Sequence, residues 1–265
     1  MEADIVKKIM DAVENAGCDN AETGAGNCTE NKEAVAPCGL TEFVGTGTGD
    51  TVGLVIANLD ADLREKIQLD PKYRSIGIVS SRTGGAPHIM SADVAVKATN
   101  TIVAAVEFAR DTKGGAGHGS TTIFASEDVS DARRAVEIML AELDENFGNV
   151  YGCDAGHIEL HYTARASFAL EKAFSAPVGK AFGISVGAPA AVGMLMADVA
   201  LKTANVDIIT YASPAVGTCF SNEIIITFTG DAGAVRQAVL EAREVGLSVL
   251  KGMGQNPVSV TKPVW

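Results

Sequence analysis

The chain is poor in aromatic residues and has no paired cysteines. Only 5% of its 265 residues are Phe, Tyr or Trp, whereas hydrophobic residues make up 47%. The core must therefore be built mainly from Ala, Val, Ile and Leu, which allow flat surfaces to pack closely. The five cysteines are odd in number and lack paired spacing, which favours reduced thiols over a disulfide framework.

Positive charge is also scarce. The 21 Lys and Arg residues face 33 Asp and Glu residues, and the formal net charge is −12. Without a basic stripe to neutralise phosphates, binding to nucleic acid or to an anionic membrane is not expected. No apolar run approaches the roughly 20 residues that cross a bilayer, and the N-terminal residues lack the apolar segment of a signal peptide. We therefore expect a cytoplasmic protein.

Motifs of enzymes and cofactor sites are missing as well. The glycine-rich stretch 113–120 does not match the phosphate-binding loop G-x-x-x-x-G-K-[ST], and Gly45–Gly49 does not match the dinucleotide fingerprint. The sequence shows no Ser-His-Asp arrangement, no paired general acid/base carboxylates and no redox C-x-x-C. We expect no catalytic residues, no cofactor and no enzymatic activity.

One strand pattern gathers polar groups. His157, Glu159 and His161 alternate with apolar residues, so on a strand all three share one face. Two imidazoles and a carboxylate could hold a metal ion. The same alternation is typical of a strand with one water-facing or interface-facing surface, and no nearby cluster completes a zinc site. We favour this second interpretation and expect no metal.

The chain repeats itself. Ile76-Gly77-Ile78 recurs as Phe182-Gly183-Ile184, a shift of 106, and Asp93 and Lys97 recur as Asp198 and Lys202, a shift of 105. A nearly constant shift indicates two copies of one small domain, separated by short insertions or deletions. Duplicated domains commonly supply equivalent positions in a symmetric object. This favours an assembling protein over one with a single deep active site.

Three regions follow: residues 1–41, a first repeat at 42–149, and a second repeat at 150–265 that includes a short tail. In the first repeat, hydrophobic periodicity predicts strands at 52–58, 75–80, 102–108 and 120–125, and helical segments at 63–69, 92–99 and 130–143. In the second, it predicts strands at 157–163, 181–186, 207–211 and 223–229, and helices at 170–174, 194–204 and 234–245. Each repeat is therefore expected to be a small α/β domain, a sheet with helices packed on one face.

The first 41 residues differ from the repeats. Ile5, Ile9 and Val13 form one apolar stripe of a short helical pattern, and residues 18–41 read as a linker without periodicity. Such a helix is marginal alone, so its stripe requires a cover. Two hypotheses remain open: the helix docks in a groove of a partner, or it folds back on its own assembly.

The second repeat carries a recognisable order of motifs. Residues 202–206 read K-T-A-N-V, and a glycine-containing loop at 214–221, a strand and G-D-A-G-A-V at 230–235 follow. This order resembles the bacterial microcompartment shell family, whose single-domain members carry K-A-A-N-V, a strand, a glycine-rich pore loop, another strand and G-D-x-G-A-V. The first repeat is a looser match, at 97–101 and 127–132.

The resemblance extends over the whole chain after about residue 42. The strand that ends the single-domain form precedes each repeat here, at 52–58 and 157–163, which is a circular permutation used twice. The phrases PKYRSIGI, DTKGGAGHGS and AGHIELHYTARAS resemble tandem-domain members of the propanediol-utilisation and ethanol-utilisation types. The implied assembly is a homotrimer that forms a pseudohexagonal tile. Such tiles pack with other shell proteins around encapsulated enzymes, and residues 1–41 are a candidate segment for binding that enzyme cargo.

The family also implies roles for individual residues. Lys97, Asn100, Lys202 and Asn205 match the positions at the tile edge. The two glycine loops match pore positions, with glycerol or a diol as a candidate permeant; their candidate residues are Gly115, Gly117, His118, Gly119, Ser120, Gly217, Thr218, Cys219 and Ser221. In permuted tandem members the narrowest channel can also lie between the two domains of one chain, and Cys219 can be a simple core filler. The alternative function is a regulatory trimer that binds a small molecule.

Overall fold

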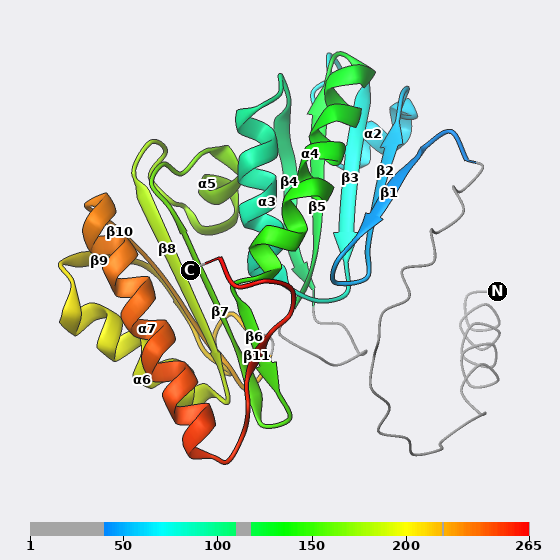
Figure 1. Ribbon diagram of the computed structural model, residues 1–265. Coiled ribbons are helices and arrows are strands. Elements are labelled where there is room, and N and C mark those ends of the chain that lie inside the picture. Colours follow the sequence, from blue (N-terminus) through cyan, green and yellow to red (C-terminus); the bar gives the residue numbers. More distant parts are fainter. Residues whose placement is uncertain (1–39, 110–117, 219, 265) are drawn as a thin grey trace, which may run out of the picture. The chain divides into compact units, whose positions relative to one another are not determined.

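The computed structural model describes residues 40–109, 118–218 and 220–264, all within the unit Cys38–Trp265 (Figure 1). The first repeat contains β1 (Phe43–Gly47), β2 (Thr51–Ile56), α2 (Ala61–Lys66), β3 (Ser75–Ser81), α3 (Gly85–Lys97), β4 (Ile102–Ala109), β5 (Gly119–Ser126) and α4 (Val129–Phe147). The second contains β6 (Val150–Cys153), β7 (Gly156–Thr163), α5 (Phe168–Phe174), β8 (Ala181–Ala188), α6 (Ala190–Thr203), β9 (Val206–Ala212), β10 (Ile224–Gly230), α7 (Ala232–Gly252) and β11 (Val258–Ser259).

Each repeat forms its own antiparallel sheet, and the two sheets share one strand order. The first sheet runs β1-β2-β3-β5-β4, and the second runs β11-β6-β7-β8-β10-β9. Apart from the added edge strand β11, each strand of the second sheet occupies the place of its counterpart in the first. The predicted duplication and the predicted fold class are confirmed.

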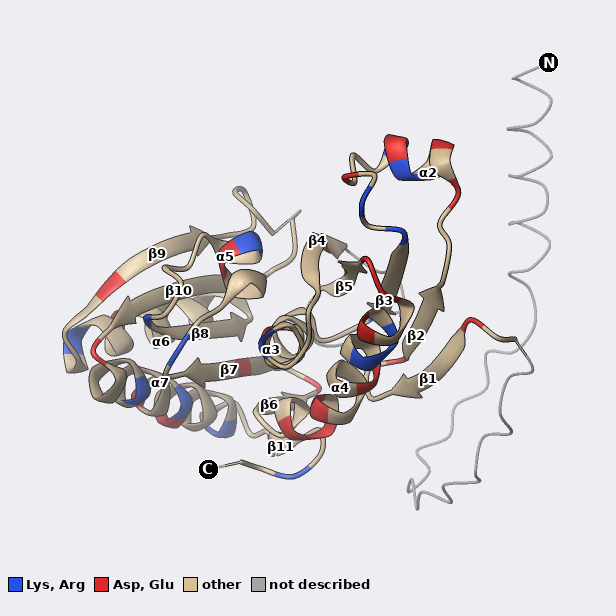
Figure 2. Cartoon of the chain, turned by 90° about the horizontal axis from the view of Figure 1, so that it is seen from above, with Lys and Arg blue, Asp and Glu red and all other residues tan. Residues whose placement is uncertain are grey.

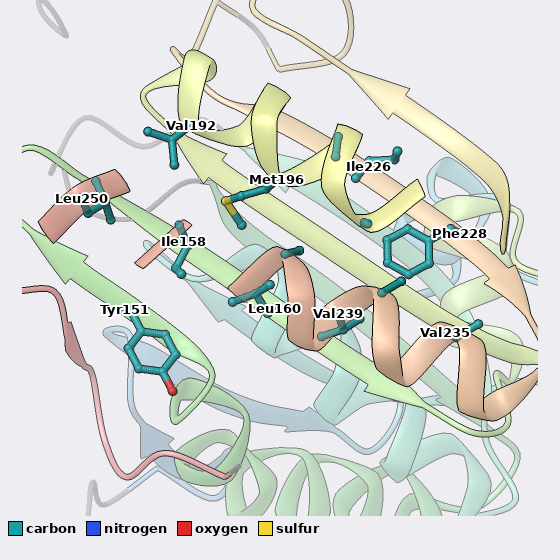
Figure 3. Close-up of a cluster of buried hydrophobic side chains, with 14 of the residues drawn as sticks. Tyr151, Ile158, Leu160, Val192, Met196, Ile226, Phe228, Val235, Val239 and Leu250 are labelled. Atoms are coloured by element: carbon teal, nitrogen blue, oxygen red, sulfur yellow. The ribbon is translucent and has the colours of Figure 1, made fainter. Parts of the chain in front are cut away.

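A long helix covers one face of each sheet. Figure 1 shows α4 across the first sheet and α7 across the second, with α3 beside α4 and α6 beside α7. The apolar stripe predicted for α4 is buried at Ala132, Ala135, Val136, Met139 and Leu143. In the second core, Ile158 and Leu160 of β7 point toward α7, while Met196 of α6 fills the space beside them (Figure 3).

The repeated Ile-Gly-Ile and Phe-Gly-Ile motifs have a packing reason. A Cβ atom on Gly77 would lie 2.6 Å from both the Ala132 carbonyl oxygen and Val136 Cγ2 of α4. A Cβ atom on Gly183 would lie 2.4 Å from Phe228 and 2.9 Å from Val235 of α7. The absent side chain therefore lets the helix approach the sheet closely in both repeats.

The two repeats are joined by α3, which packs against the second sheet. Ile89 and Met90 of α3 belong to one buried cluster with Leu170, Phe182 and Ile184 of the second repeat. Ser167 donates hydrogen bonds from its backbone N and its Oγ to Asp93 Oδ1, at 2.8 and 2.6 Å. As a result α3 is buried on two sides, by α4 of its own repeat and by the second repeat.

Some predicted boundaries were wrong. Helix α3 begins at Gly85, seven residues before the predicted start at 92, because Pro87 sits in the first turn, where a missing N–H costs nothing. No strand was predicted at 45–49, yet Gly45 and Gly47 belong to β1, which contacts Leu140 and Leu143 of α4. Strands β6 and β11 were also missed.

Several predictions fall on residues that the structure does not describe. The apolar stripe at Ile5, Ile9 and Val13 lies outside the described residues, as does the linker up to residue 39. Within the part of the chain that is described, no helix has the length and apolar character needed to span a membrane.

We predict that Gly77→Val destabilises the protein by about 1–3 kcal/mol, because the added side chain has to displace the backbone of α4. The matched control is Gly152→Val on β6, where an added Cβ meets nothing within 4 Å. The melting temperature of each variant, measured by calorimetry, checks the prediction. Equal melting temperatures for the two variants would contradict the close-approach argument.

Candidate functional site

His118 and Thr218, one described residue from each of the two glycine loops, meet inside one chain. His118 directly precedes β5, and its Nε2 lies 3.2 Å from the carbonyl oxygen of Thr218 in the loop between β9 and β10. Glu223 directly precedes β10, and its Oε1 lies 2.8 Å from Nδ1 of His118. A single imidazole thus bridges the first repeat and the second repeat at the start of two equivalent strands.

Two residues of β7 complete a buried polar cluster, defined here as His118, His157, Glu159 and Glu223. His157 Nε2 lies 3.6 Å from Glu223 Oε2 and 3.9 Å from Glu159 Oε1. All four residues are at most 9% exposed. The cluster therefore carries up to four charges where water cannot screen them.

Two opposing effects set the pKa values of the cluster: burial disfavours the charged forms, and neighbouring groups of opposite charge favour them. Burial would raise the pKa of Glu223, but the hydrogen bond from His118 and the nearby imidazole of His157 outweigh it and lower this pKa to about 2. The hydrogen bond to Glu223 raises the pKa of His118. Burial opposes the charge on His157, yet Glu223 and Glu159 raise its pKa overall. Burial also raises the pKa of Glu159, to about 7.

The neighbouring His161 is different. It lies on the same face of β7, it is 1% exposed, and neither ring nitrogen has a hydrogen-bond partner. Burial lowers its pKa to about 3, so its ring is neutral at physiological pH. Helix α3 packs against β7, and all three polar residues of this strand face are buried. No group of three or more His, Cys, Asp or Glu in the described ranges is arranged to hold a metal ion.

A cavity of about 300 Å³ opens beside the cluster. We call it the junction cavity, because α3 and β4 of the first repeat and the second sheet both line it. Glu159, Glu223 and His118 supply charge, and the remaining wall is mostly apolar, with Phe108, Phe174, Ile184, Val186 and Ile225 among its residues.

The predicted pore residues divide into three groups. Gly115, Gly117 and Cys219 lie outside the described residues. Ser120 and Thr218 are buried, and Thr218 Oγ1 already donates to the carbonyl oxygens of Ser213 and Ser221. The remaining candidates are His118, Gly119, Gly217 and Ser221, of which His118 and Gly217 line the junction cavity.

The predicted tile-edge residues occupy equivalent places in the two repeats. Lys97 Nζ lies 2.5 Å from Asp93 Oδ2 at the end of α3, and Lys202 Nζ lies 2.7 Å from Asp198 Oδ2 at the end of α6. The settings differ, because Asp93 is 1% exposed under the second repeat whereas Asp198 is 49% exposed. Asn100 and Asn205 are exposed.

Sequence reasoning missed the link between His118, Glu223 and the β7 residues. The signal was partial: three of the four histidines lie at the pore loop or on one strand face. Only the packing of α3 on the second sheet brings these segments together, and no local pattern encodes that packing.

Charged residues are concentrated on the helices (Figure 2). Helix α4 carries Asp131, Glu137, Glu142, Asp144 and Glu145, and burial raises the pKa of Glu142. The strands, in contrast, carry few charges. This distribution leaves the sheets and the inner helix faces to apolar contacts.

Comparison with known proteins places this fold. A family model for the BMC domain matches residues 181–257. The bacterial microcompartment shell protein PduB of Salmonella typhimurium is 62% identical over 228 residues, which cover 86% of this chain and 84% of that protein. The crystal structure of EtuB from Clostridium kluyveri superimposes with a TM-score of 0.83 at 59% identity, covering 85% of this chain and 99% of that one. The structure of a trimeric PduB superimposes with a TM-score of 0.82 at 47% identity, covering 85% and 100%.

Two tandem, circularly permuted BMC domains define a shell protein of bacterial microcompartments. The chain belongs to the PduB family of these shell proteins. It is a structural component of the shell. This identification replaces the alternative of a regulatory trimer that binds a small molecule.

The buried polar cluster predicts how stability depends on pH. The folded pKa of Glu159, about 7, exceeds its ordinary 4.5, so folding favours the protonated acid and stability falls as the pH rises between these values. The raised pKa values of His118 and His157 add stability below 6.5 that is lost as the pH rises through them. Glu223 adds stability above 4.5 that is lost as the pH falls toward about 2.

We therefore predict that Glu159→Gln flattens the loss of stability between pH 4.5 and about 7, because the amide has no proton to lose. Melting temperatures across this range, compared between the variant and the unmodified protein, check it. Glu137→Gln on α4 is the control, since this carboxylate is 41% exposed. If Glu159→Gln and Glu137→Gln give the same pH profile, Glu159 does not titrate in this range.

Proposed function

We propose that the chain is a non-catalytic building tile, in which three copies close a ring of six domains. The domains are residues 42–149 and 150–265, and the ring alternates between them. One observation carries the proposal: equivalent helices of the two repeats are buried to very different extents.

The helices α3 and α6 are equivalent but unequally covered. Ile89 and Met90 of α3 are 0% and 6% exposed, because they pack on the second sheet. Their equivalents on α6, shifted by 105, are Met194 and Leu195, which are 48% and 40% exposed. Full burial of such a side chain contributes about 1.5–3 kcal/mol, so the exposed pair marks a surface that lacks its cover.

The sheets show the complementary difference. Ile184 on the outer face of the second sheet is 2% exposed under α3. Its equivalent in the first sheet, Ile78, is only partly buried, and so are its outer-face neighbours Leu54 and Ile56. A second copy that lays Met194 and Leu195 on this face would repeat the contact that already exists inside one chain. Repeating the contact three times closes a ring, in agreement with the trimer named for the PduB structure.

Lys97, Asn100, Lys202 and Asn205 are proposed as contacts between neighbouring tiles. The two lysines are paired with aspartates in the same geometry at the ends of equivalent helices. An exposed contact contributes only about 0–1 kcal/mol. A lattice repeats the contact at every edge, which makes a weak contact sufficient.

We also propose that small polar molecules such as glycerol or a diol cross the tile beside the glycine loops. His118, Gly217 and the junction cavity between the repeats support a route inside each chain. Selection there would depend on width and hydrogen bonding. Gly115, Gly117, Gly119, Ser120, Thr218, Cys219 and Ser221 remain the proposed surroundings of that route.

Residues 1–41 are proposed to attach enzyme cargo to the shell. The stripe of Ile5, Ile9 and Val13 suits a groove of a partner. A helix this short binds weakly, but many copies in one shell multiply the effect.

We predict that Met194→Asp combined with Leu195→Asp abolishes the trimer, because two carboxylates cannot be buried on an apolar sheet face. Light scattering coupled to size-exclusion chromatography should give the mass of one folded chain. Lys202→Asp is the matched control: it should leave trimers intact and abolish extended sheets in electron micrographs. If the double variant still forms trimers of unchanged stability, the ring model is wrong.

We predict that replacing Ile5, Ile9 and Val13 with Ser separates enzyme cargo from the shell while shells still assemble. Co-purification of cargo with intact shells measures the effect. Replacing Lys7, Lys8 and Asp11, on the other faces of the helical pattern, with Ser is the control and should retain the cargo. Full cargo retention in the Ile5, Ile9 and Val13 variant refutes the attachment role, and dissociation of the trimer supports the folded-back helix instead.

A further inference from the structure

We propose that two carboxylates, Asp60 of one copy and Asp198 of the next, set the strength of the contact between copies of this chain. This inference rests on the proposed ring and adds to it. The partner is a second copy of the same chain, and the boundary between copies carries a repulsion that the boundary inside the chain lacks.

The boundary inside one chain shows how the contact is made without that repulsion. Ser167 is the N-cap of α5, and its backbone N and its Oγ donate to Asp93 Oδ1 on α3, at 2.8 and 2.6 Å. The other carboxylate oxygen, Asp93 Oδ2, lies 2.5 Å from Lys97 Nζ. One oxygen of this buried acid thus accepts two hydrogen bonds, and the other faces a cation.

The duplication identifies the equivalent strand positions in the two repeats. Val52 and Leu54 of β2 occupy the same register against β3 as Glu159 and His161 of β7 occupy against β8. Val52 is therefore the equivalent of Glu159, and Leu54 is the equivalent of His161, at a shift of 107.

The same shift identifies the residues at the boundary between copies. It brings Asp60, the N-cap of α2, to Ser167, the N-cap of α5. Asp198 of α6 is the equivalent of Asp93, at the shift of 105 found in the sequence. In the ring, Asp60 of one copy therefore takes the place of Ser167, next to Asp198 of the neighbouring copy.

Both residues lie on surface that a single chain leaves uncovered. Asp60 is exposed, whereas Ser167 is 9% exposed. The Asp198 side chain is 49% exposed, whereas that of Asp93 is 1% exposed. The helices agree, because α2 has no buried residue while α5 has two. The uncovered positions are thus those that the ring would bring together.

A carboxylate cannot replace the serine hydroxyl. Its oxygens have no hydrogen to donate, and Asp60 Oδ1 already accepts from the backbone N–H groups of Asp62 and Leu63, at 3.0 and 3.2 Å. In the ring, Asp60 brings a second negative charge to the place where Ser167 donates a hydrogen bond. Like charges that face each other across an interface disfavour association.

Lys202 reduces this repulsion without removing it. Its Nζ lies 2.7 Å from Asp198 Oδ2, the same pairing that Lys97 makes with Asp93. Between copies one ammonium group faces two carboxylates, whereas inside the chain it faces one. The boundary between copies is therefore the weaker of the two kinds of boundary in the ring.

Asp60→Ser tests the proposal, because it gives the boundary between copies the serine found inside the chain. Ser is itself a favourable N-cap, so α2 keeps its start. Two samples of trimers with different fluorescent labels are mixed, and energy transfer measures how fast they exchange chains. We expect exchange at least about tenfold slower in the variant, because interface substitutions act mainly on dissociation. Unchanged exchange overturns the proposal, and so does faster exchange, which would mean that Lys202 binds both acids favourably.

Glu65→Ser is the matched control. It removes the same charge from the same helix, at a place whose equivalent, Glu171, is exposed even on the covered helix α5. Exchange should be unchanged; an effect equal to that of Asp60→Ser would reflect overall charge and overturn the proposal.

A second variant and the ring itself are tested separately. Asp198→Asn removes the other acid and should also slow exchange at least about tenfold, so it decides the proposal if Asp60→Ser fails to fold. If Met194→Asp with Leu195→Asp leaves the trimer intact, the ring model is wrong. If that pair abolishes the trimer but neither Asp60→Ser nor Asp198→Asn slows exchange, the ring stands and the acid pair is refuted.

Discussion

The arrangement of the two repeats depends on the burial of α3 between α4 and the second repeat. This helix packs against α4 on one side and against Phe182, Ile184 and Leu170 of the second repeat on the other. The contact fixes the orientation of the second sheet relative to the first. It also brings β7 next to the N-terminus of α3, where the backbone of Ala86 hydrogen-bonds to Glu159. Without this apolar contact the polar groups of the two repeats would never meet.

The polar cluster lies at the edge of that contact and fixes the relative position of the two repeats. Apolar packing alone tolerates small slips between surfaces, because it has no preferred direction. The bridge from His118 to Glu223 and Thr218 has fixed lengths, and it ties the starts of β5 and β10 together. The hydrogen bonds from Ser167 to Asp93 do the same at the other end of α3. The junction therefore has an apolar centre and a directional bond at each end.

Most strands and helices of each repeat could be predicted from the sequence, but the contact between the two repeats could not. Strands rich in Val and Ile, such as 75–80 and 102–108, were predicted within two residues of their observed ends, because their apolar character is local. The start of α3 was missed because Gly84-Gly85-Ala86-Pro87 reads as a loop, although Pro is favourable in a first helical turn. Strand β1 was missed because its glycines serve contact with α4, which lies about a hundred residues away in the chain.

The candidate site was anticipated only in part. His118 and Thr218 were singled out from the glycine loops, and the shared face of His157, Glu159 and His161 followed from strand alternation. Their meeting depends on a contact between repeats, so it could not be derived from spacing. Glu223 was read only as the start of a strand. Its role follows from position, since it occupies the place that Gly119 takes in the first repeat, and no sequence pattern distinguishes it from an ordinary exposed acid.

The unequal outer faces of the two sheets have a geometric consequence. In a ring of six identical domains every boundary between neighbours must have the same chemistry, so any opening would be repeated six times. Fusing two copies removes that restriction. In the proposed ring, three boundaries would be lined by Glu159 and His161 and the other three by Val52 and Leu54. Boundaries with charged residues and apolar boundaries would then alternate around the same tile. Substitutions at one kind of boundary would leave the other kind unchanged.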